Sequence, residues 1–388
     1  MLALVLAGCG GHPVPPEAAP HVVADAAPVA YASERLRYSV TEQVVGLEHP
    51  WSLAFLPDGG VLVTERAGRL RRIGADGSVS APIDGLPEIF ADGQAGLFDV
   101  VLSPGFAVDH QVYWSYAEGN WRGNLVGAAV ARGRLEGDRL RDVQVIFRQL
   151  PKRSAGTNLG TRLVFDGHGH LFIGLGDGRV AAAEAQQLDS LQGKLARIDP
   201  DGGIPADNPF VARAGARAAI WSYGHRNIQG AALDPRTGQL WTSEHGPMGG
   251  DELNIPEAGR NYGWPVITYG LGYDGQPVPG SVGTSAPGME QPVHYWKKSP
   301  ALSGMAFYTG DAFEPWKGNL FLGALAGASL IRLELDGNRV VHEERLLADR
   351  GERIRDVRQG PDGALYVLVD ADEGKLLRLA PAASPAPK

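Results

Sequence analysis

The feature that most restricts the fold of this chain is a unit that recurs six times along it. Each copy begins with a turn containing Pro, Asp or Gly and continues as an alternating apolar strand, as in Asp58-Gly59 followed by Val61 to Val63. The six turns lie at 56–59, 103–104, 166–167, 234–235, 315–316 and 361–363. Such a unit cannot bury both of its faces alone, so copies of it stack around an axis as blades. We therefore predict an all-β fold, a six-bladed β-propeller, over residues 37–380.

The spacing of the copies indicates where the propeller carries its long loops. The first two copies and the last two are separated by close to the ~45 residues of one four-stranded blade. The middle copies are further apart, which places long insertions between Asp142 and Pro315, and long loops on a rigid scaffold commonly carry binding sites. The best helical candidate, residues 180–191, is read as a short helix or an ordered loop. A pair of β-sandwich domains is the alternative fold, which the even repetition disfavours.

The two ends of the chain lack the repeat. Residues 1–9 are read as a truncated signal sequence, because Leu6 to Cys9 resembles the lipobox at which bacterial lipoproteins are cleaved and acylated on cysteine. A short apolar N-terminus without function is the alternative. Residues 10–36 are rich in Pro and Ala and predict a flexible tether, and residues 381–388 predict a disordered tail. The expected location is the periplasm or the outer envelope, with membrane contact only through a lipid on Cys9.

Charge and cysteine content exclude several classes of function. The net charge is −8 at pH 7, so the chain lacks the basic surface that nucleic acid requires. Because Cys9 is the one cysteine, the predicted propeller has no disulfide, thiolate metal site or cysteine nucleophile. The sequence also contains no His-Glu-x-x-His, no phosphate-binding loop and no Gly-x-Ser-x-Gly.

Polar residues gather in the middle insertions, first around Arg226 and Asn227. An arginine supplies a forked donor for a carboxylate, and an asparagine supplies an amide beside it. The alternative interpretation of Arg226 is a structural ion pair with Glu244 or Asp251. For this pair of residues the sequence leaves anion binding and an ion pair both open.

A second polar cluster contains the turn Gly246-Pro247. Such a turn can aim bare carbonyl oxygens at a hard cation such as Ca²⁺, which takes oxygen ligands. The neighbouring His245 is interpreted as a hydrogen-bonded histidine of the blade. Propeller loops can also gather carboxylates, so a calcium-dependent hydrolase or lactonase is an alternative function. Its candidate ligands are Asp177, Asp251 and Glu252.

Several segments, in this order, resemble the glucose/sorbosone dehydrogenase family, the soluble aldose sugar dehydrogenases that use pyrroloquinoline quinone (PQQ) and calcium. They are Asp92 to Leu97, Arg162 to Asp166, Gly193 to Phe210, Tyr223 to Asn227, Glu244 to Pro247 and Arg353 to Val357. The resemblance runs from about Val44 to Leu379. It implies a six-bladed propeller that oxidises the anomeric hydroxyl of an aldose to a lactone by hydride transfer to PQQ, and then reduces an unidentified electron acceptor.

The resemblance also implies roles for particular residues. The cofactor-binding residues would be Arg226, Asn227, Gly246, Arg353 and Arg355, since PQQ carries three carboxylates. The carbonyl oxygens of Gly246 and Pro247 would hold Ca²⁺, which polarises the quinone. Gln94 and Asp177 would line the sugar pocket.

The chain departs from the family where the general base is expected. That base is a His in a His-x-Gly-x-Arg-Leu stretch, and Asn158 stands at its position here. An asparagine amide does not accept a proton at neutral pH, so Asp177 is predicted to take over, with Asn158 and Gln94 beside it. The stretch from Gly323 to Ala326 also lacks a lysine that the family often carries. A propeller that binds sugar or cofactor with weakened turnover is therefore a further alternative.

Overall fold

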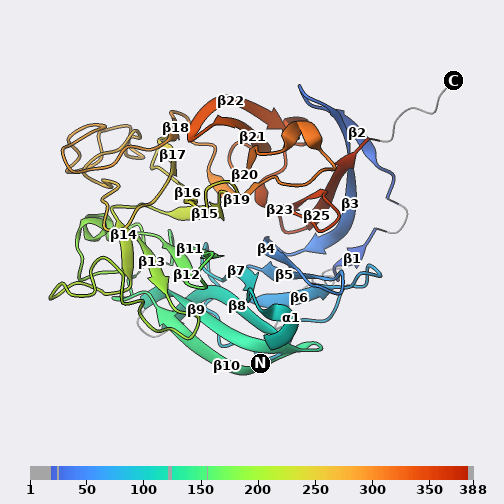
Figure 1. Ribbon diagram of the computed structural model, residues 1–388, viewed down its shortest axis with the longest axis horizontal. Coiled ribbons are helices and arrows are strands. Elements are labelled where there is room, and N and C mark those ends of the chain that lie inside the picture. Colours follow the sequence, from blue (N-terminus) through green and yellow to red (C-terminus); the bar gives the residue numbers. More distant parts are fainter. Residues whose placement is uncertain (1–18, 24–25, 121–124, 155, 383–388) are drawn as a thin grey trace, which may run out of the picture.

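Six β-sheets surround a central axis in the computed structural model (Figure 1), which describes residues 19–23, 26–120, 125–154 and 156–382. This arrangement confirms the predicted six-bladed β-propeller. Blade one has β4 (Pro50–Phe55), β5 (Val61–Glu65) and β6 (Arg69–Ile73); blade two has β7 (Leu97–Leu102), β8 (Gln111–Asn120), β9 (Leu125–Glu136) and β10 (Arg139–Arg148). Blade three has β11 (Gly160–Phe165), β12 (Leu171–Leu175), β13 (Lys194–Ile198) and β14 (Ile220–Tyr223).

The second half of the chain builds the other three blades. Blade four has β15 (Ile228–Leu233), β16 (Leu240–Glu244), β17 (Asp251–Asn254) and β18 (His294–Trp296); blade five has β19 (Leu302–Phe307), β20 (Leu320–Ala324), β21 (Ser329–Asp336) and β22 (Arg339–Leu346). Blade six has β23 (Ile354–Gln359), β24 (Leu365–Val369) and β25 (Gly374–Pro381), and β3 (Arg37–Leu47) is its outer strand, with β1 (His21–Val22) and β2 (Val29–Ala32) beyond. The helical segments are α1 (Phe106–Asp109), η1 (Ala182–Gln186), η2 (Glu314–Trp316) and η3 (Ala348–Arg350).

The recurring turn of the sequence occupies the same position in all six blades. Each of the six turns joins the first strand of a blade to the second, with which it pairs antiparallel. The first strands of neighbouring blades contact one another around the whole ring, from β4 through β7, β11, β15, β19 and β23 back to β4. All six turns therefore lie at one end of the axis. The starts of the first strands and the ends of the second strands lie at the other.

The ring closes through an N-terminal strand. β3 pairs with β25, with Val45 opposite Lys375 and Tyr38 opposite Pro381, so blade six is built from both ends of the chain. β2 pairs with β3, and the Tyr31 ring stacks on Tyr38 with a centroid distance of 5.5 Å. The tether predicted for 10–36 is therefore too long, because pairing and ring stacking hold 29–32 against the blade.

The terminal predictions fall largely outside the described residues. Three predicted features lie outside the described residues: the lipobox with Cys9, the first part of the tether and most of the tail. Within the part of the chain that the structure describes, no helix is long and apolar enough to cross a membrane. The segment 180–191, predicted as a short helix or an ordered loop, contains the five-residue 3-10 helix η1.

Four charged side chains meet near the axis, and three of them are buried: Arg162, Asp99 and Asp356. Arg162 is 1% exposed, and its guanidinium pairs with Asp99 at 3.2 Å and with Asp356 at 3.1 Å. Arg358 pairs with the same two carboxylates, at 3.3 and 3.0 Å. The Arg162 guanidinium also lies 4.2 Å from the centroid of the Trp51 ring. This cluster fills the axis beneath Trp51.

Removing one charge of this axial cluster is expected to destabilise the fold strongly. Arg162→Met should lower the free energy of unfolding by about 3–5 kcal/mol, because it leaves buried carboxylates short of a partner. Arg139→Met is the matched control: Arg139 pairs with Asp84 at the surface, where both side chains are mostly exposed, and should cost less than about 1 kcal/mol. Urea unfolding with linear extrapolation measures both values. Equal losses in the two variants would contradict the assigned role of the axial cluster.

Candidate active site

A cavity of about 270 Å³ lies at the end of the axis opposite the six turns. It is lined by Trp51, Arg66, Gln94, Phe98, Asn158, Leu159, Gly160, Arg226, Asn227, Gln229, His245, Tyr273, Ala301, Leu325, Arg353 and Arg355. Most of these positions follow from blade register. Asn227 and Arg353 stand directly before first strands, whereas Arg66, His245 and Leu325 stand directly after second strands.

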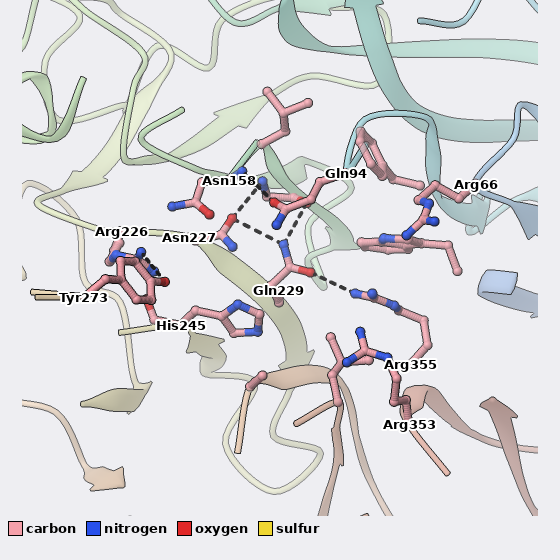
Figure 2. A pocket seen from close by; sticks show the side chains of 16 residues that line it. Arg66, Gln94, Asn158, Arg226, Asn227, Gln229, His245, Tyr273, Arg353 and Arg355 are labelled. Carbon is pink, nitrogen blue, oxygen red and sulfur yellow. Dashed lines mark hydrogen bonds between the residues drawn. The ribbon is translucent and has the colours of Figure 1, made fainter. Parts of the chain in front are cut away.

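The lining of the cavity is strongly cationic. Figure 2 shows Arg226, Tyr273 and His245 on one side and Arg66, Arg353 and Arg355 on the other. None of the lining residues is an aspartate or a glutamate, although the chain as a whole carries a net charge of −8. Such a concentration of guanidinium groups is suited to an anion with several carboxylates.

Arg226 has no carboxylate partner for its side chain among the described residues. It is 5% exposed, and its Nη1 donates to the carbonyl oxygens of His245 (3.0 Å) and Gly246 (2.6 Å). Its Nε is buried and has no partner in the described part of the chain. A buried guanidinium nitrogen in this state costs free energy unless a ligand accepts from it.

The ion pair considered for Arg226 with Glu244 or Asp251 is therefore not formed. Glu244 accepts the backbone N–H of Arg226 at 2.6 Å and bonds to the imidazole of His225 at 2.9 Å. Asp251 accepts the backbone N–H groups of Gly246 and Leu302, each at 3.1 Å. Both acids bond to the backbone of the loops around Arg226, and neither pairs with its guanidinium.

Arg353 and Arg355 share one carboxylate. The Asp370 Oδ2 atom accepts from each of them at 3.0 Å. Burial raises the pKa of Asp370, but the charges of Arg355 and Arg353 and the bond to His49 outweigh it and hold that pKa well below its usual value. Arg355 Nη1 also donates to Gln229 at 3.2 Å, and its Nε is buried without a partner. Arg355 therefore resembles Arg226 in offering an unsatisfied donor.

Asp177 lies behind Asn158 instead of facing the cavity. It is 1% exposed and is not a lining residue. Its carboxylate accepts from Asn158 Nδ2 (3.0 Å), Trp264 Nε1 (2.9 Å) and the backbone N–H of Arg179 (2.7 Å). These three donors hold the carboxylate away from the pocket, so the expected position of Asp177 at the mouth is not observed.

The Asp177 contact orients the amide of Asn158. Because Nδ2 donates to Asp177, Oδ1 is left without a protein donor among the described residues and is available as an acceptor. Gln94 also lines the cavity, and its Oε1 accepts the backbone N–H of Asn158 at 3.3 Å. Asn227 uses its Oδ1 on Gly160 N–H at 3.1 Å, which leaves its amide donor for a ligand. The predicted residues Gln94, Asn158 and Asn227 are thus brought together.

The structure does not assemble the carboxylates of the hydrolase alternative. Asp177, Asp251 and Glu252 are held by different partners, and the described residues contain no group of three or more His, Cys, Asp or Glu side chains that could hold a metal. Burial and the charge of Glu244 raise the pKa of Glu252 to about 8. The raised pKa favours the neutral form of this carboxyl group, which is a weaker ligand for Ca²⁺ than a carboxylate.

The sequence did not predict Arg66 or His245 as lining residues of the cavity. Arg66 follows β5, and within the described chain its side chain has no hydrogen bond or ion pair. His245 does bond within the blade, as expected, because its Nε2 donates to the carbonyl of Leu302, but it also lines the cavity. Burial lowers the pKa of His245. The rule that would have found both is their shared position directly after the second strand of a blade.

The sequence and fold of this chain are similar to those of known proteins. The family model described as glucose/sorbosone dehydrogenase matches residues 47–378. The chain belongs to the glucose/sorbosone dehydrogenase family. It is 52% identical over 338 residues to the aldose sugar dehydrogenase YliI of Escherichia coli, covering 86% of this chain and 91% of that protein.

Solved structures of this family agree with the fold. The apo-form of the soluble aldose sugar dehydrogenase of Escherichia coli has a TM-score of 0.86 at 50% identity, covering 89% of this chain and 100% of that one. A PQQ-bound aldose sugar dehydrogenase of Streptomyces coelicolor has a TM-score of 0.71 at 28% identity, covering 91% of this chain and 100% of that one. This member of the glucose/sorbosone dehydrogenase family is accordingly an oxidoreductase of the aldose sugar dehydrogenase type.

Proposed function

We propose that this oxidoreductase converts the anomeric hydroxyl of an aldose to the lactone, with PQQ as the hydride acceptor and Ca²⁺ assisting. The observation that carries the proposal is the pair of buried guanidinium nitrogens, Arg226 Nε and Arg355 Nε, that lack a partner beside a cavity without acidic lining residues. A ligand with several carboxylates would satisfy both. The PQQ-bound relative from Streptomyces coelicolor supports PQQ as that ligand.

The residues present fit PQQ on chemical grounds. Arg226 on one side, and Arg353 with Arg355 on the other, would hold its carboxylates, with Asn227 donating a hydrogen bond. Trp51 adds a flat apolar surface to the lining. When bound, PQQ supplies the two-electron acceptor that no side chain can supply. The protein contributes charge, orientation and exclusion of water.

The sugar side of the pocket would be formed by Gln94 and Asn158. Asn158 Oδ1, held by the contact with Asp177, accepts a hydrogen bond from the anomeric hydroxyl and orients the C–H bond that breaks. Asn158 does not take the proton, because an amide is not a base at neutral pH. We therefore propose that the hydroxyl proton passes to a water molecule, and that this slow transfer limits turnover. The second candidate function, a propeller that binds its ligands with weak turnover, is favoured by this same residue.

Calcium is the second ligand of the proposal. The carbonyl oxygens of Gly246 and Pro247 are hard ligands of the kind that Ca²⁺ takes. The Gly246 oxygen here accepts from Arg226, so a cation already occupies this electronegative position. Calcium binding would therefore go together with transfer of Arg226 from this carbonyl to a carboxylate of the cofactor.

The proposed reaction has a direct test. Purified protein supplied with PQQ and CaCl₂ should reduce an artificial dye when glucose is added, and excess EDTA should lower the rate until calcium is restored. Dye reduction without added PQQ, by protein shown to contain none, would contradict the PQQ assignment. An EDTA-insensitive rate would contradict the calcium assignment alone. PQQ binding without sugar oxidation would favour the binding propeller.

The cellular location remains part of the proposal. We propose export to the periplasm or outer envelope with lipid attachment at Cys9, on the basis of the lipobox-like stretch. The proposed partners are an aldose and an electron acceptor. Incorporation of labelled palmitate into the expressed chain, and its loss in Cys9→Ala, tests the lipid attachment.

A further inference from the structure

Trp264 contacts both halves of the pocket from behind. It lies in the long loop between β17 and β18 and is 8% exposed. Its indole Nε1 donates to Asp177 Oδ2 at 2.9 Å, and Asp177 Oδ1 in turn accepts from Asn158 at 3.0 Å. The guanidinium carbon of Arg226 lies 5.3 Å from the centroid of its ring. The Trp264 side chain thus contacts both Asp177, which holds the Asn158 amide on the sugar side, and Arg226 on the cofactor side.

Trp264 is itself firmly placed. Its backbone N–H donates to Gly224 O at 2.8 Å, and its carbonyl oxygen accepts from Gln186 Nε2 of η1 at 2.7 Å. Its side chain packs with Ala185 and Val278. Contacts from two other segments therefore fix this ring, so that it can act as a rigid reference for flexible neighbours.

The two contacts use different parts of the indole. The hydrogen bond to Asp177 requires the N–H group, which holds one carboxylate oxygen so that the other can accept from Asn158. The contact with Arg226 requires only the aromatic face, which attracts a cation through the ring quadrupole. A substitution that removes the N–H and keeps a ring should therefore separate the two effects.

We propose that Trp264 is a positioning residue that orients Asn158 toward the sugar through Asp177 and holds Arg226 in place for a carboxylate of the cofactor. This inference rests on the proposed function. It means that a residue of the loop between β17 and β18 helps to align both the sugar and the cofactor. Trp264 is not expected to touch either partner, since it is not a lining residue of the cavity.

Three single variants separate this role from simple packing. Trp264→Phe keeps the aromatic face and removes the N–H, whereas Trp264→Leu removes both. Trp221→Phe is the matched control, because Trp221 also donates through Nε1, to Pro256 O at 3.4 Å, and also carries an arginine, Arg197, at 4.7 Å from its ring. Trp221 lies outside the cavity lining.

The measurements are the PQQ dissociation constant of the apoprotein by calorimetry, kcat/KM for glucose with saturating PQQ, and the Tm of each variant. Trp264→Phe should lower kcat/KM roughly tenfold, as expected for loss of a hydrogen bond to a charged group, and leave the PQQ dissociation constant within about twofold. Trp264→Leu should change both quantities. Trp221→Phe should change neither.

A double-mutant cycle completes the test. In an Asn158→Ala background, Trp264→Phe should cause no further loss of kcat/KM, because the amide that it orients is gone. Three outcomes would overturn the role of Trp264 and leave the proposed function standing. They are equal losses of kcat/KM and PQQ affinity in Trp264→Phe, additive losses in the cycle, and the same changes in Trp221→Phe. Wild-type protein that binds no PQQ would overturn the proposed function and the role of Trp264 together.

Discussion

Arg226→Gln is expected to weaken PQQ binding by about 100-fold or more. The substitution removes a desolvated guanidinium from a charge-assisted contact, and such truncations commonly cost about 2–5 kcal/mol, where 1.4 kcal/mol is tenfold. Arg226→Lys should recover only part of this affinity, because an ammonium group does not reproduce the planar fork. Calorimetric titration of the apoprotein with PQQ gives both dissociation constants.

The matched control for Arg226 is Arg260→Gln in the same insertion. Arg260 is mostly exposed and lies near Glu257 and Glu290, away from the cavity. The Arg260→Gln variant should bind PQQ as tightly as the wild type does. If Arg226→Gln bound PQQ as tightly as Arg260→Gln does, the unsatisfied Nε of Arg226 would not mark the cofactor site.

Asn158→His is expected to raise kcat for glucose by roughly 10²–10⁴-fold, the usual effect of a positioned general base. Asp177 already accepts an N–H from residue 158 at 3.0 Å. A histidine there would donate one ring N–H to Asp177 and present its other nitrogen to the sugar hydroxyl, as in other carboxylate–histidine pairs. Steady-state kinetics with a dye acceptor and saturating PQQ measures the gain.

The control for Asn158→His is the same substitution combined with Asp177→Asn. Without the carboxylate, the imidazole loses the partner that fixes its tautomer and orientation, so most of the gain should disappear. An unchanged kcat in Asn158→His would show that the wild-type protein already removes the proton efficiently by another group. Asn158 would then not be the orienting acceptor that we propose.

The sequence predicted the fold because the constraint is local and repeated. Each of the six turns lies between two strands that pair directly with one another, so a pattern of a few residues is enough to indicate one blade. The insertion 180–191 was less predictable, since its short η1 helix is held by contacts from distant loops, such as Gln186 with Trp264. The pairing of 29–32 with β3 was hidden in a Pro/Ala-rich composition that is typical of tethers.

The site was predictable only in part, for a related reason. Four of the predicted residues belong to distinctive motifs beside or within recognisable strands, and all four line the cavity: Arg226, Asn227, Arg353 and Arg355. The position of Asp177 depends on which donors surround it, and Trp264 comes from a loop 87 residues away in the chain. Arg66 carries no motif, and its role in the lining follows only from the register of its blade.

A crystal structure of the protein grown with PQQ and calcium tests the proposed function most directly. We expect density for PQQ in the cavity, with its carboxylates on Arg226 and Arg355 and with Asn158 facing the open side of the ligand. Density for PQQ at another place, or an empty cavity in crystals grown with excess PQQ and calcium, would contradict the proposed function.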